Sequence, residues 1–293
     1  MTPCARRPST TVIGNWLVSS REAGLTSSIA AVWSHRSVLR LLVQRDLTVK
    51  YQQSVLGYLW SLIEPLTMAA IYYFIFGVLY GGGRDGMSGT DYIMFILSGI
   101  FAWMWANSAI SESTSALVSQ ARMITTIKVP REIFPLGRVI GRFAEYVAGL
   151  PILILGAVIF KADFGWHTLY ALPLAVIVQA IFLVGISLML SALNVMLRDV
   201  ERFMRLALRI LFYAAPIIYP LSQVTNSDMP QWVKIVYQAD PLVGIFQLHH
   251  AAWFANEWPS PALLATSIGG SLLVFLFGWL MFRKLEPSVL KEL

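Results

Sequence analysis

Four arginines are spaced so that one helical face would carry all of them. Arg198, Arg202, Arg205 and Arg209 are four, three and four residues apart, and residues at these separations lie on one side of a helix. A guanidinium group binds phosphate oxygens through two parallel hydrogen bonds. The spacing predicts a cationic face that contacts an anionic head group. The alternative is that these long side chains only reach for the water at a helix end and orient the chain.

A second set of candidate binding residues is aromatic. Flat aromatic faces are good surfaces for sugar rings, although packing against lipid or against other helices is the alternative for each of them. The candidates are Trp60, Tyr72, Tyr73, Phe76, Tyr213 and Tyr219.

Few ionisable residues lie inside the apolar stretches, where such groups are costly and often functional. Glu64 precedes Pro65, and Glu145 lies one helical turn after Arg142, so a local ion pair is expected there. A proton relay would need more acids than these. Three uncharged polar residues are expected to join helices by hydrogen bonds: Gln179, Asn107 and Asn194.

Sequence motifs for catalysis are absent. No Gly is followed by Lys, which excludes a Walker-type phosphate loop, and the patterns Asp-x-Asp, HExxH and GxSxG do not occur. The single cysteine, Cys4, excludes an intrachain disulfide. We therefore expect no catalysis by this chain.

Composition indicates a membrane protein. The chain is 57% hydrophobic and 13% charged, whereas about a quarter of a soluble domain is charged. A helix that crosses a bilayer needs about 20 mostly apolar residues. We expect an all-α integral membrane protein with six transmembrane helices, the fourth ending outside near Pro173 and the fifth short. The expected spans are Leu62–Tyr80, Tyr92–Ile110, Phe143–Phe160, Leu169–Val195, Leu206–Tyr219 and Leu263–Phe282.

The basic residues predict the orientation of these spans. Of the 22 Lys and Arg residues, all but Arg84, Lys161 and Lys234 fall before the first span, in alternate loops or after the sixth span. Cytoplasmic loops carry such an excess of Lys and Arg. Both chain ends are therefore expected in the cytoplasm. The net charge of +6 is explained by anionic lipid at that surface, so nucleic acid is not an expected partner.

Two regions do not fit simple spans. Residues 33–56, after a flexible cytoplasmic tail at 1–32, predict an amphipathic helix on the cytoplasmic surface, because Leu42 and its apolar neighbours lie opposite Arg36 and Arg40. Residues 220–261, within the membrane domain at 57–293, form a long external segment. Its most apolar part, Leu242–Phe254, is too short to cross and predicts short re-entrant helices.

Six segments in order carry a resemblance to a known family. The segments read LLVQRDLTVKYQQSVLGYLWSLIEPL, FILSGIFAWMW, TTIKVPREIFPLGRVI, LNVMLRDVERF, AAPIIYP and ADPLVGIFQ. They lie in order between Leu41 and Gln247, and the chain from Leu41 onward resembles ABC-2 type permeases that export polysaccharides.

The resemblance implies partners and a substrate class. It implies a homodimer of six-span subunits in the bacterial cytoplasmic membrane, above two separate nucleotide-binding ATPase subunits that hold ATP and Mg²⁺, with no cofactor on this chain. The implied cargo is O-antigen, teichoic acid, capsule or cell-wall galactan on a polyprenyl diphosphate carrier.

The resemblance also implies roles for particular residues. The amphipathic helix becomes an interface helix on the ATPase, residues 112–138 become a coupling loop, and the first and fifth spans line the channel. Coupling to the ATPase is implied for Arg36, Arg40, Arg45, Asp46, Lys128, Pro130, Arg131, Glu132, Arg198 and Asp199. An external gate is implied for Leu242, Phe246, Trp253 and Phe254.

Other functions remain open at this point. An ABC-2 permease for a drug or a small lipid would share the same topology. An integral-membrane transferase acting on lipid-linked sugars would need an acidic or histidine catalytic cluster, and none is visible. A passive channel is disfavoured because the sequence contains no filter motif.

Overall fold

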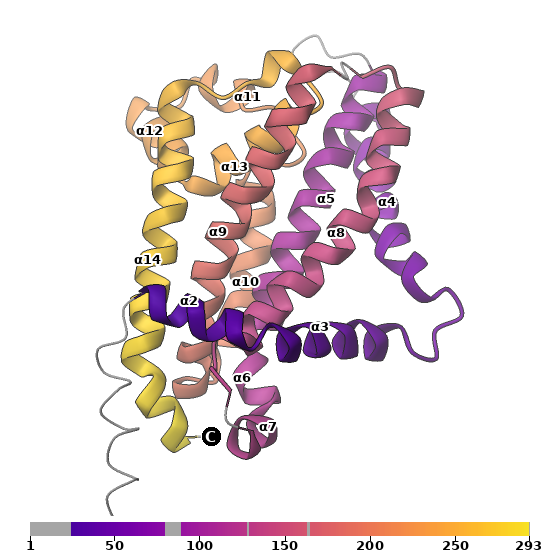
Figure 1. Cartoon of the computed structure of the whole chain (residues 1–293). Coiled ribbons are helices and arrows are strands. Elements are labelled where there is room, and N and C mark those ends of the chain that lie inside the picture. The colour runs from indigo at the N-terminus through magenta and orange to yellow at the C-terminus, as the bar shows by residue number, and fades with distance from the viewer. Residues whose placement is uncertain (1–24, 80–88, 128, 163–164, 293) are drawn as a thin grey trace, which may run out of the picture.

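The computed structural model describes residues 25–79, 89–127, 129–162 and 165–292. The residues in these ranges form helices and turns, with no strand among them, and Figure 1 shows them as one bundle. The residues before Leu25, the glycine-rich residues 80–88 and Lys128 lie outside the described residues, so the predictions that fall on them stay predictions.

Among the described residues, five helices are long and apolar enough to cross a membrane. They match five of the six expected spans. They are Gly57–Leu79 (η1, Gly57–Leu59; α4, Trp60–Tyr72; η2, Tyr73–Leu79), α5 (Gly89–Thr114), α8 (Ile133–Ile159), α9 (Trp166–Met196) and α14 (Pro261–Glu292).

The helix at the expected fifth span is α10 (Asp199–Ala214). It starts earlier than expected and ends five residues before Tyr219, so the expected boundaries were wrong. Its 16 residues span about 24 Å, less than the roughly 30 Å of a hydrocarbon core. Pro216 and Pro220 prevent continuation because proline lacks a backbone N–H. The chain continues from Ala214 without a helix through buried residues 215–218.

Prolines break these helices less than expected. The expectation that Pro173 ends its span was wrong, because α9 begins at Trp166 and continues through Pro173. α4 likewise continues through Pro65. Pro65 is the sixth residue of α4 and Pro173 the eighth residue of α9. Both lie beyond the four amides that a helix start leaves unpaired, so each removes one backbone hydrogen bond without ending its helix.

The charged segment before α8 is more helical than a loop. The expected coupling loop at 112–138 contains the end of α5, the short helices α6 (Ala116–Ser119) and α7 (Ala121–Thr126), and the first turns of α8. α8 starts ten residues before the expected Phe143, because the charged residues of its first turns are paired with neighbouring helices.

α5 lies at the centre of the bundle and α4 at its edge. In the most apolar part of each, 78% of α5 is buried but only 11% of the Gly57–Leu79 segment. α9 and α14 pack along their length, and their backbones approach closely at Gly185. A Cβ atom there would lie 2.4 Å from the Cα atom of Phe275, so only glycine allows this crossing.

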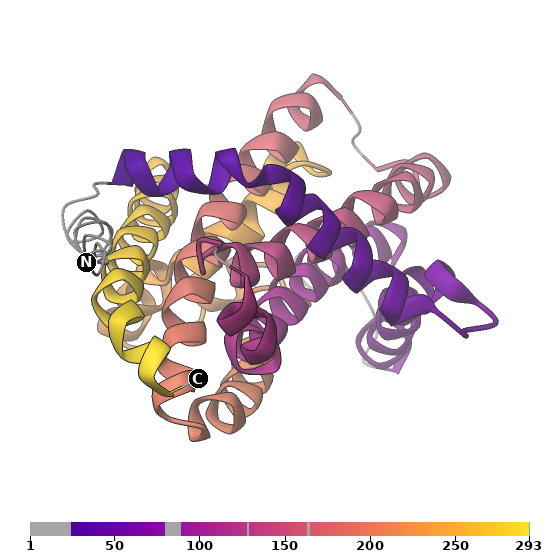
Figure 2. The ribbon, with the colours of Figure 1, turned by 60° about the horizontal axis from the view of Figure 1, so that its bottom comes forward.

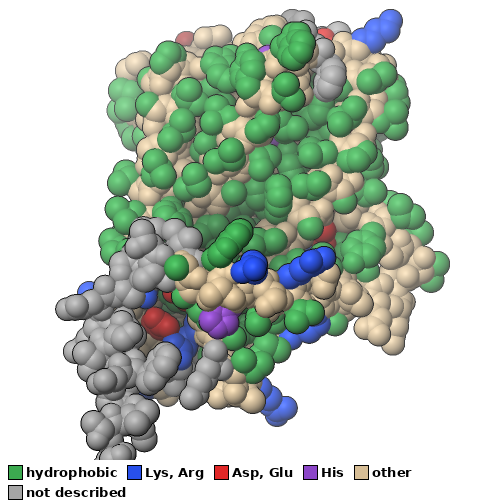
Figure 3. Space-filling model, in the orientation of Figure 1, with side chains coloured by type: hydrophobic (Ala, Val, Ile, Leu, Met, Phe, Trp, Pro, Cys, Tyr) green, Lys and Arg blue, Asp and Glu red, His purple; other side chains and the backbone are tan. Residues whose placement is uncertain are grey.

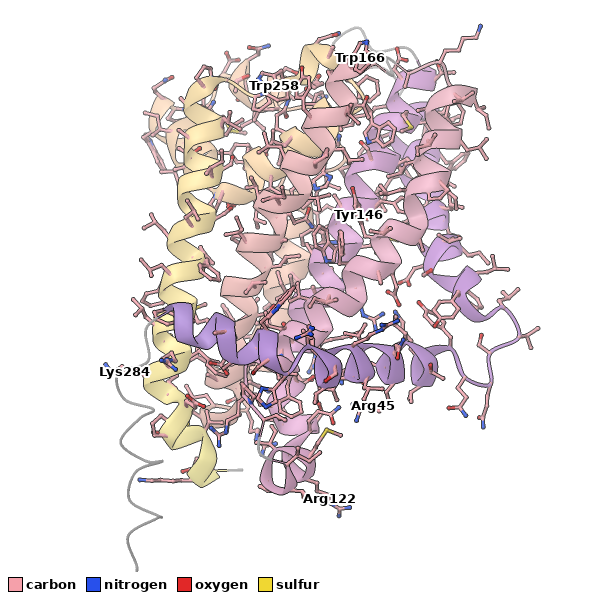
Figure 4. All side chains as sticks on the ribbon, in the orientation of Figure 1. Arg45, Arg122, Tyr146, Trp166, Trp258 and Lys284 are labelled. Atoms are coloured by element: carbon pink, nitrogen blue, oxygen red, sulfur yellow. The ribbon has the colours of Figure 1, made fainter. Side chains whose placement is uncertain are left out.

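The two ends of the bundle differ in chemistry. α2 (Leu25–Ser34) and α3 (Arg36–Tyr51) cross one end, which also carries α7 and the carboxyl end of α14 (Figures 1 and 2). Arg45, Arg122 and Lys284 lie at this end, whereas Trp166 and Trp258 lie at the other (Figure 4). A mostly hydrophobic surface separates them on the face shown in Figure 3.

The end opposite α3 is built from residues 220–261. α11 (Ser222–Thr225), α12 (Gln231–Ala239) and η4 (Ala255–Glu257) lie at its surface, while α13 (Pro241–Ala251) packs on α5, α9 and α14 (Figure 1). The 11 residues of α13 are too few to cross a bilayer.

Candidate functional site

The predicted cationic face lies on α10. Arg202 Nη1 lies 3.7 Å from Asp199 Oδ1, and Arg205 Nη1 lies 2.7 Å from Glu201 Oε1. These pairs are solvent-exposed and contribute little stability, which leaves the guanidinium groups accessible to another anion. No ion pair of Arg209 occurs among the described contacts. The exposed residues of this face are Arg198, Arg202, Arg205 and Arg209.

Aromatic residues predicted from two distant segments meet between α4 and α10. The hydroxyl groups of Tyr72 and Tyr213 lie 3.3 Å apart. The Tyr72 ring centre is 5.3 Å from that of Phe212 and 6.2 Å from that of Phe76. Tyr213 is largely exposed, so a ligand at this surface would contact an aromatic face.

The aromatic contacts continue from α10 to α12. The Tyr219 hydroxyl donates a hydrogen bond to the Ala214 carbonyl at 2.7 Å and lies 3.2 Å from the Tyr237 hydroxyl. Trp60 and Tyr73 are not part of this set of aromatic contacts. Trp60 is half exposed at the start of α4, and the Tyr73 ring lies against Gly77. We call the connected residues the aromatic strip: Tyr72, Phe76, Phe212, Tyr213, Tyr219 and Tyr237.

The surface helix α3 is held to the bundle by charged residues. Asp46 Oδ2 lies 3.2 Å from Arg138 Nη1, and Glu145 Oε1 lies 3.1 Å from Lys50 Nζ. The Tyr51 hydroxyl donates a hydrogen bond of 2.6 Å to Glu145. Burial is the main cause that raises the pKa of the Tyr51 phenol, and the contact with the Glu145 carboxylate raises it further. α3 is therefore fixed to α8 by contacts between residues about 95 positions apart.

The expected ion pair of Arg142 with Glu145 is present. Arg142 is almost fully buried, and its Nε atom lies 3.0 Å from Glu112 Oε2. The pair thus belongs to a larger set that joins α3, α5 and α8, which we call the charge chain: Arg45, Asp46, Arg138, Glu112, Arg142, Glu145 and Lys50.

Small residues explain where α3 crosses α8. Added Cβ atoms at Gly137 and Gly141 would lie 3.7 Å from Leu39 Cδ1 and 4.0 Å from Val43 Cγ1. The apolar side of α3 therefore rests on the two glycines of α8. Arg36 and Arg40 on the other side of α3 are exposed.

The predicted coupling residues before α8 contact the end of α14. Arg131 Nη1 lies 2.6 Å from Glu286 Oε1. Glu132 is buried, and this burial raises the pKa of its carboxyl group, with the nearby Glu286 carboxylate adding to the effect. Pro130 is half-buried. These residues join α8 to α14 rather than extending freely from a loop.

The predicted external gate residues lie in the core. Phe246 and Trp253 are at most 1% exposed, and the Phe246 ring centre is 6.0 Å from that of Trp103 on α5. Leu242 and Phe254 are also buried. α13 fills the inside of the bundle, and none of these four side chains lies on the surface of the bundle.

Two histidines of α13 were not identified as site residues from the sequence. His249 Nε2 lies 2.6 Å from Gln179 Oε1 on α9, and Gln179 donates a hydrogen bond to the Ala102 carbonyl on α5. His250 Nε2 lies 2.9 Å from the Pro216 carbonyl and its Nδ1 lies 3.0 Å from Ser98 Oγ. The sequence signal for such a role was the occurrence of two adjacent histidines in an apolar helix. Adjacent side chains of a helix point about 100° apart, so the two histidines contact different neighbouring segments.

These polar contacts confirm part of the hydrogen-bonding prediction. Gln179 joins α9 to α5 and α13. The hydroxyl group of Tyr146, a residue near the middle of the bundle (Figure 4), lies 3.3 Å from the other ring nitrogen of His249. Asn194 on α9 accepts a hydrogen bond from the Glu201 amide of α10.

Comparison with known proteins gives one consistent result. Residues 37–254 match the family described as "ABC-2 type transporter". An "O-antigen export system permease protein RfbA" of Klebsiella pneumoniae is 32% identical over 85% of this chain and 92% of that protein. A protein of the same description from Myxococcus xanthus is 25% identical over 82% of this chain and 90% of its own length. The "Capsule polysaccharide export inner-membrane protein CtrC" of Neisseria meningitidis is 21% identical over 87% and 93%.

Proposed function

This chain belongs to the ABC-2 type transporter family, and we propose that it is the membrane permease subunit of an ATP-driven polysaccharide exporter. The observation that carries this function is the match, over 85% of the chain, to an O-antigen export permease. A capsule export protein matches over a similar length. The relatives therefore share a polysaccharide cargo although they differ in the polymer.

ATP is hydrolysed on a separate subunit in this proposal. The chain has no Gly-Lys pair and therefore no Walker phosphate loop. The end of the bundle that carries α3 and α7 is the contact surface for the ATPase, with exposed Arg36 and Arg40 of α3 among its residues. Positive charge at this end fits the cytoplasmic side of the bacterial inner membrane.

Six crossings of the membrane fit the path of the chain better than five. α10 starts beside the end of α9 and is followed by residues 215–220, which lead toward α11 at the opposite end (Figure 1). Together they supply the fifth crossing. The described chain then starts and finishes at the same end, in keeping with cytoplasmic termini.

The channel in this proposal lies between two copies of the chain. The Gly57–Leu79 segment is mostly unburied in a single copy. Its Tyr72 contacts Tyr213 and Phe212 of α10, the helix that also carries the arginines. Six helices enclose too little space for a polymer, whereas a two-fold dimer forms a conduit between its copies. Aromatic faces would contact the sugars, and Arg202 and Arg205 would bind the diphosphate of the lipid carrier.

Deletion of the gene tests this function in cells. We expect lipid-linked polysaccharide to accumulate on the cytoplasmic side and surface polymer to disappear, and the wild-type chain to restore export. Surface polymer at the normal level, with no accumulation inside, would refute the proposed function.

A further inference from the structure

A pocket of about 460 Å³ lies between α3 and α8, where the ion pairs that hold α3 are located. Val49 and Gln120 contribute the uncharged part of its wall. Its charged lining is Arg45, Asp46, Lys50, Glu112, Arg138 and Arg142.

The charge chain that borders this pocket alternates in sign from end to end. Its links are Arg45 to Asp46 at 2.8 Å, Asp46 to Arg138 at 3.2 Å, Arg138 to Glu112 at 3.9 Å, Glu112 to Arg142 at 3.0 Å, Arg142 to Glu145, and Glu145 to Lys50 at 3.1 Å. Four cations therefore face three carboxylates, and each carboxylate lies between two cations.

The surplus positive charge lies at the ends of the chain. The end residues, Arg45 and Lys50, both belong to α3, and their side chains are 37% and 38% exposed. The inner cations, Arg138 and Arg142, are only 19% and 3% exposed. Each end cation contacts one carboxylate, whereas each inner cation contacts two. One further anion between the ends would close the chain into a ring and match its charge.

We infer that this pocket binds the phosphodiester head group of an anionic phospholipid from the cytoplasmic leaflet. A phosphodiester carries one negative charge, equal to the surplus, whereas the diphosphate of a lipid carrier would bring more negative charge than the chain can match. Guanidinium and ammonium groups are the side chains that bind phosphate. Glu64 lines only a smaller adjoining cavity of about 40 Å³, and no ion pair joins it to the chain among the described residues.

The lipid source follows from the position of the pocket. Arg45 lies on the underside of the bundle on α3 (Figure 4), at the level where the hydrophobic surface gives way to charge (Figure 3). Anionic lipids of the cytoplasmic leaflet concentrate beside basic residues at that level. The inference uses the cytoplasmic placement of α3 from the proposed function but not the transported polymer.

The test measures retained lipid on the purified full chain, without ATP or polymer. The protein is placed in nanodiscs of phosphatidylcholine with or without about a fifth of phosphatidylglycerol. The readouts are the shift in thermal midpoint caused by phosphatidylglycerol and the lipid retained in native mass spectrometry. The variants are Arg45→Gln and Lys50→Gln, the conservative Lys50→Arg, and the control Arg40→Gln, which removes an exposed charge from α3 outside the pocket.

We expect wild type, Lys50→Arg and Arg40→Gln to retain phosphatidylglycerol. Arg45→Gln and Lys50→Gln should bind it about tenfold more weakly, because a hydrogen bond to a charged group contributes about 1.5 kcal/mol or more. Each variant is compared with itself in phosphatidylcholine, so a lower basal stability does not affect the result.

Three results would overturn the inference. They are no phosphatidylglycerol effect on wild type, equal retention by Arg40→Gln and the two pocket variants, and displacement of the lipid by inorganic phosphate alone. Because no transport is measured, loss of export in cells would test the proposed function separately.

Discussion

The charge chain predicts a large loss of stability when Glu145 is replaced by Gln. The Glu145 carboxylate contacts Lys50 Nζ at 3.1 Å, the Tyr51 hydroxyl at 2.6 Å and the guanidinium of Arg142. Gln keeps the shape and can still accept from Tyr51, but it leaves Arg142, which is 3% exposed, with one carboxylate fewer.

The size of the effect follows from burial. Removing one partner of a fully buried ion pair costs about 3–5 kcal/mol, whereas an exposed pair contributes about 1 kcal/mol or less. Glu145 is 14% exposed and Lys50 is 38% exposed, so we expect the lower end, about 3 kcal/mol. For a chain of this size that lowers the thermal midpoint by about 6–12 °C.

Thermal unfolding of the detergent-solubilised protein, followed by fluorescence, measures this change. Glu64→Gln is the matched control, because Glu64 is an exposed carboxylate on the adjacent helix α4 with no ion pair among the described contacts. It should shift the midpoint by less than about 2 °C. Equal midpoints for Glu145→Gln and Glu64→Gln would refute the role assigned to the charge chain.

Three further predictions concern other parts of the molecule. Gly185→Ala should destabilise the chain by about 1–3 kcal/mol because its Cβ atom would meet the backbone of α14 at 2.4 Å, whereas Gly269→Ala, with open space around it, should stabilise it by about 0.5 kcal/mol; reversed thermal shifts would contradict this packing. Glu132→Gln should raise the thermal midpoint at neutral pH, because burial raises the pKa of the Glu132 carboxyl group. The folded wild-type chain therefore loses stability as the pH rises through that pKa. An increase in thermal midpoint that is largest below the unfolded pKa of about 4.3 would contradict this pH dependence. Replacing Arg202 and Arg205 by Gln should lower polymer export about tenfold or more at normal protein abundance, and unchanged surface polymer would remove their assigned role.

Hydropathy and helical spacing predict much of the fold because they report on local burial. Five expected spans coincide with long helices. Predictions from local sequence alone were wrong where contacts with other helices determine the structure. α9 continues through Pro173 although this residue removes one backbone hydrogen bond. The coupling loop is mostly helical, and its Arg131 and Arg138 are paired with residues of α14, α3 and α5.

The site residues were predicted less completely. The aromatic residues Tyr72 and Tyr213 were chosen by type, but their contact depends on how α4 packs beside α10. Lys50 and Glu145 are 95 residues apart, and no sequence pattern reports such a pairing. The residues implied for the external gate, such as Phe246, are buried inside the bundle, because an apolar segment that is too short to cross can fill the bundle interior.

Transport in proteoliposomes tests the central claim most directly. The chain and the nucleotide-binding ATPase subunit proposed as its partner would be reconstituted together with labelled lipid-linked polysaccharide on the side where ATP is supplied. We expect ATP-dependent movement of the polymer to the other side, and no movement when either protein is omitted. Movement at the same rate without ATP, or with this chain alone, would contradict it.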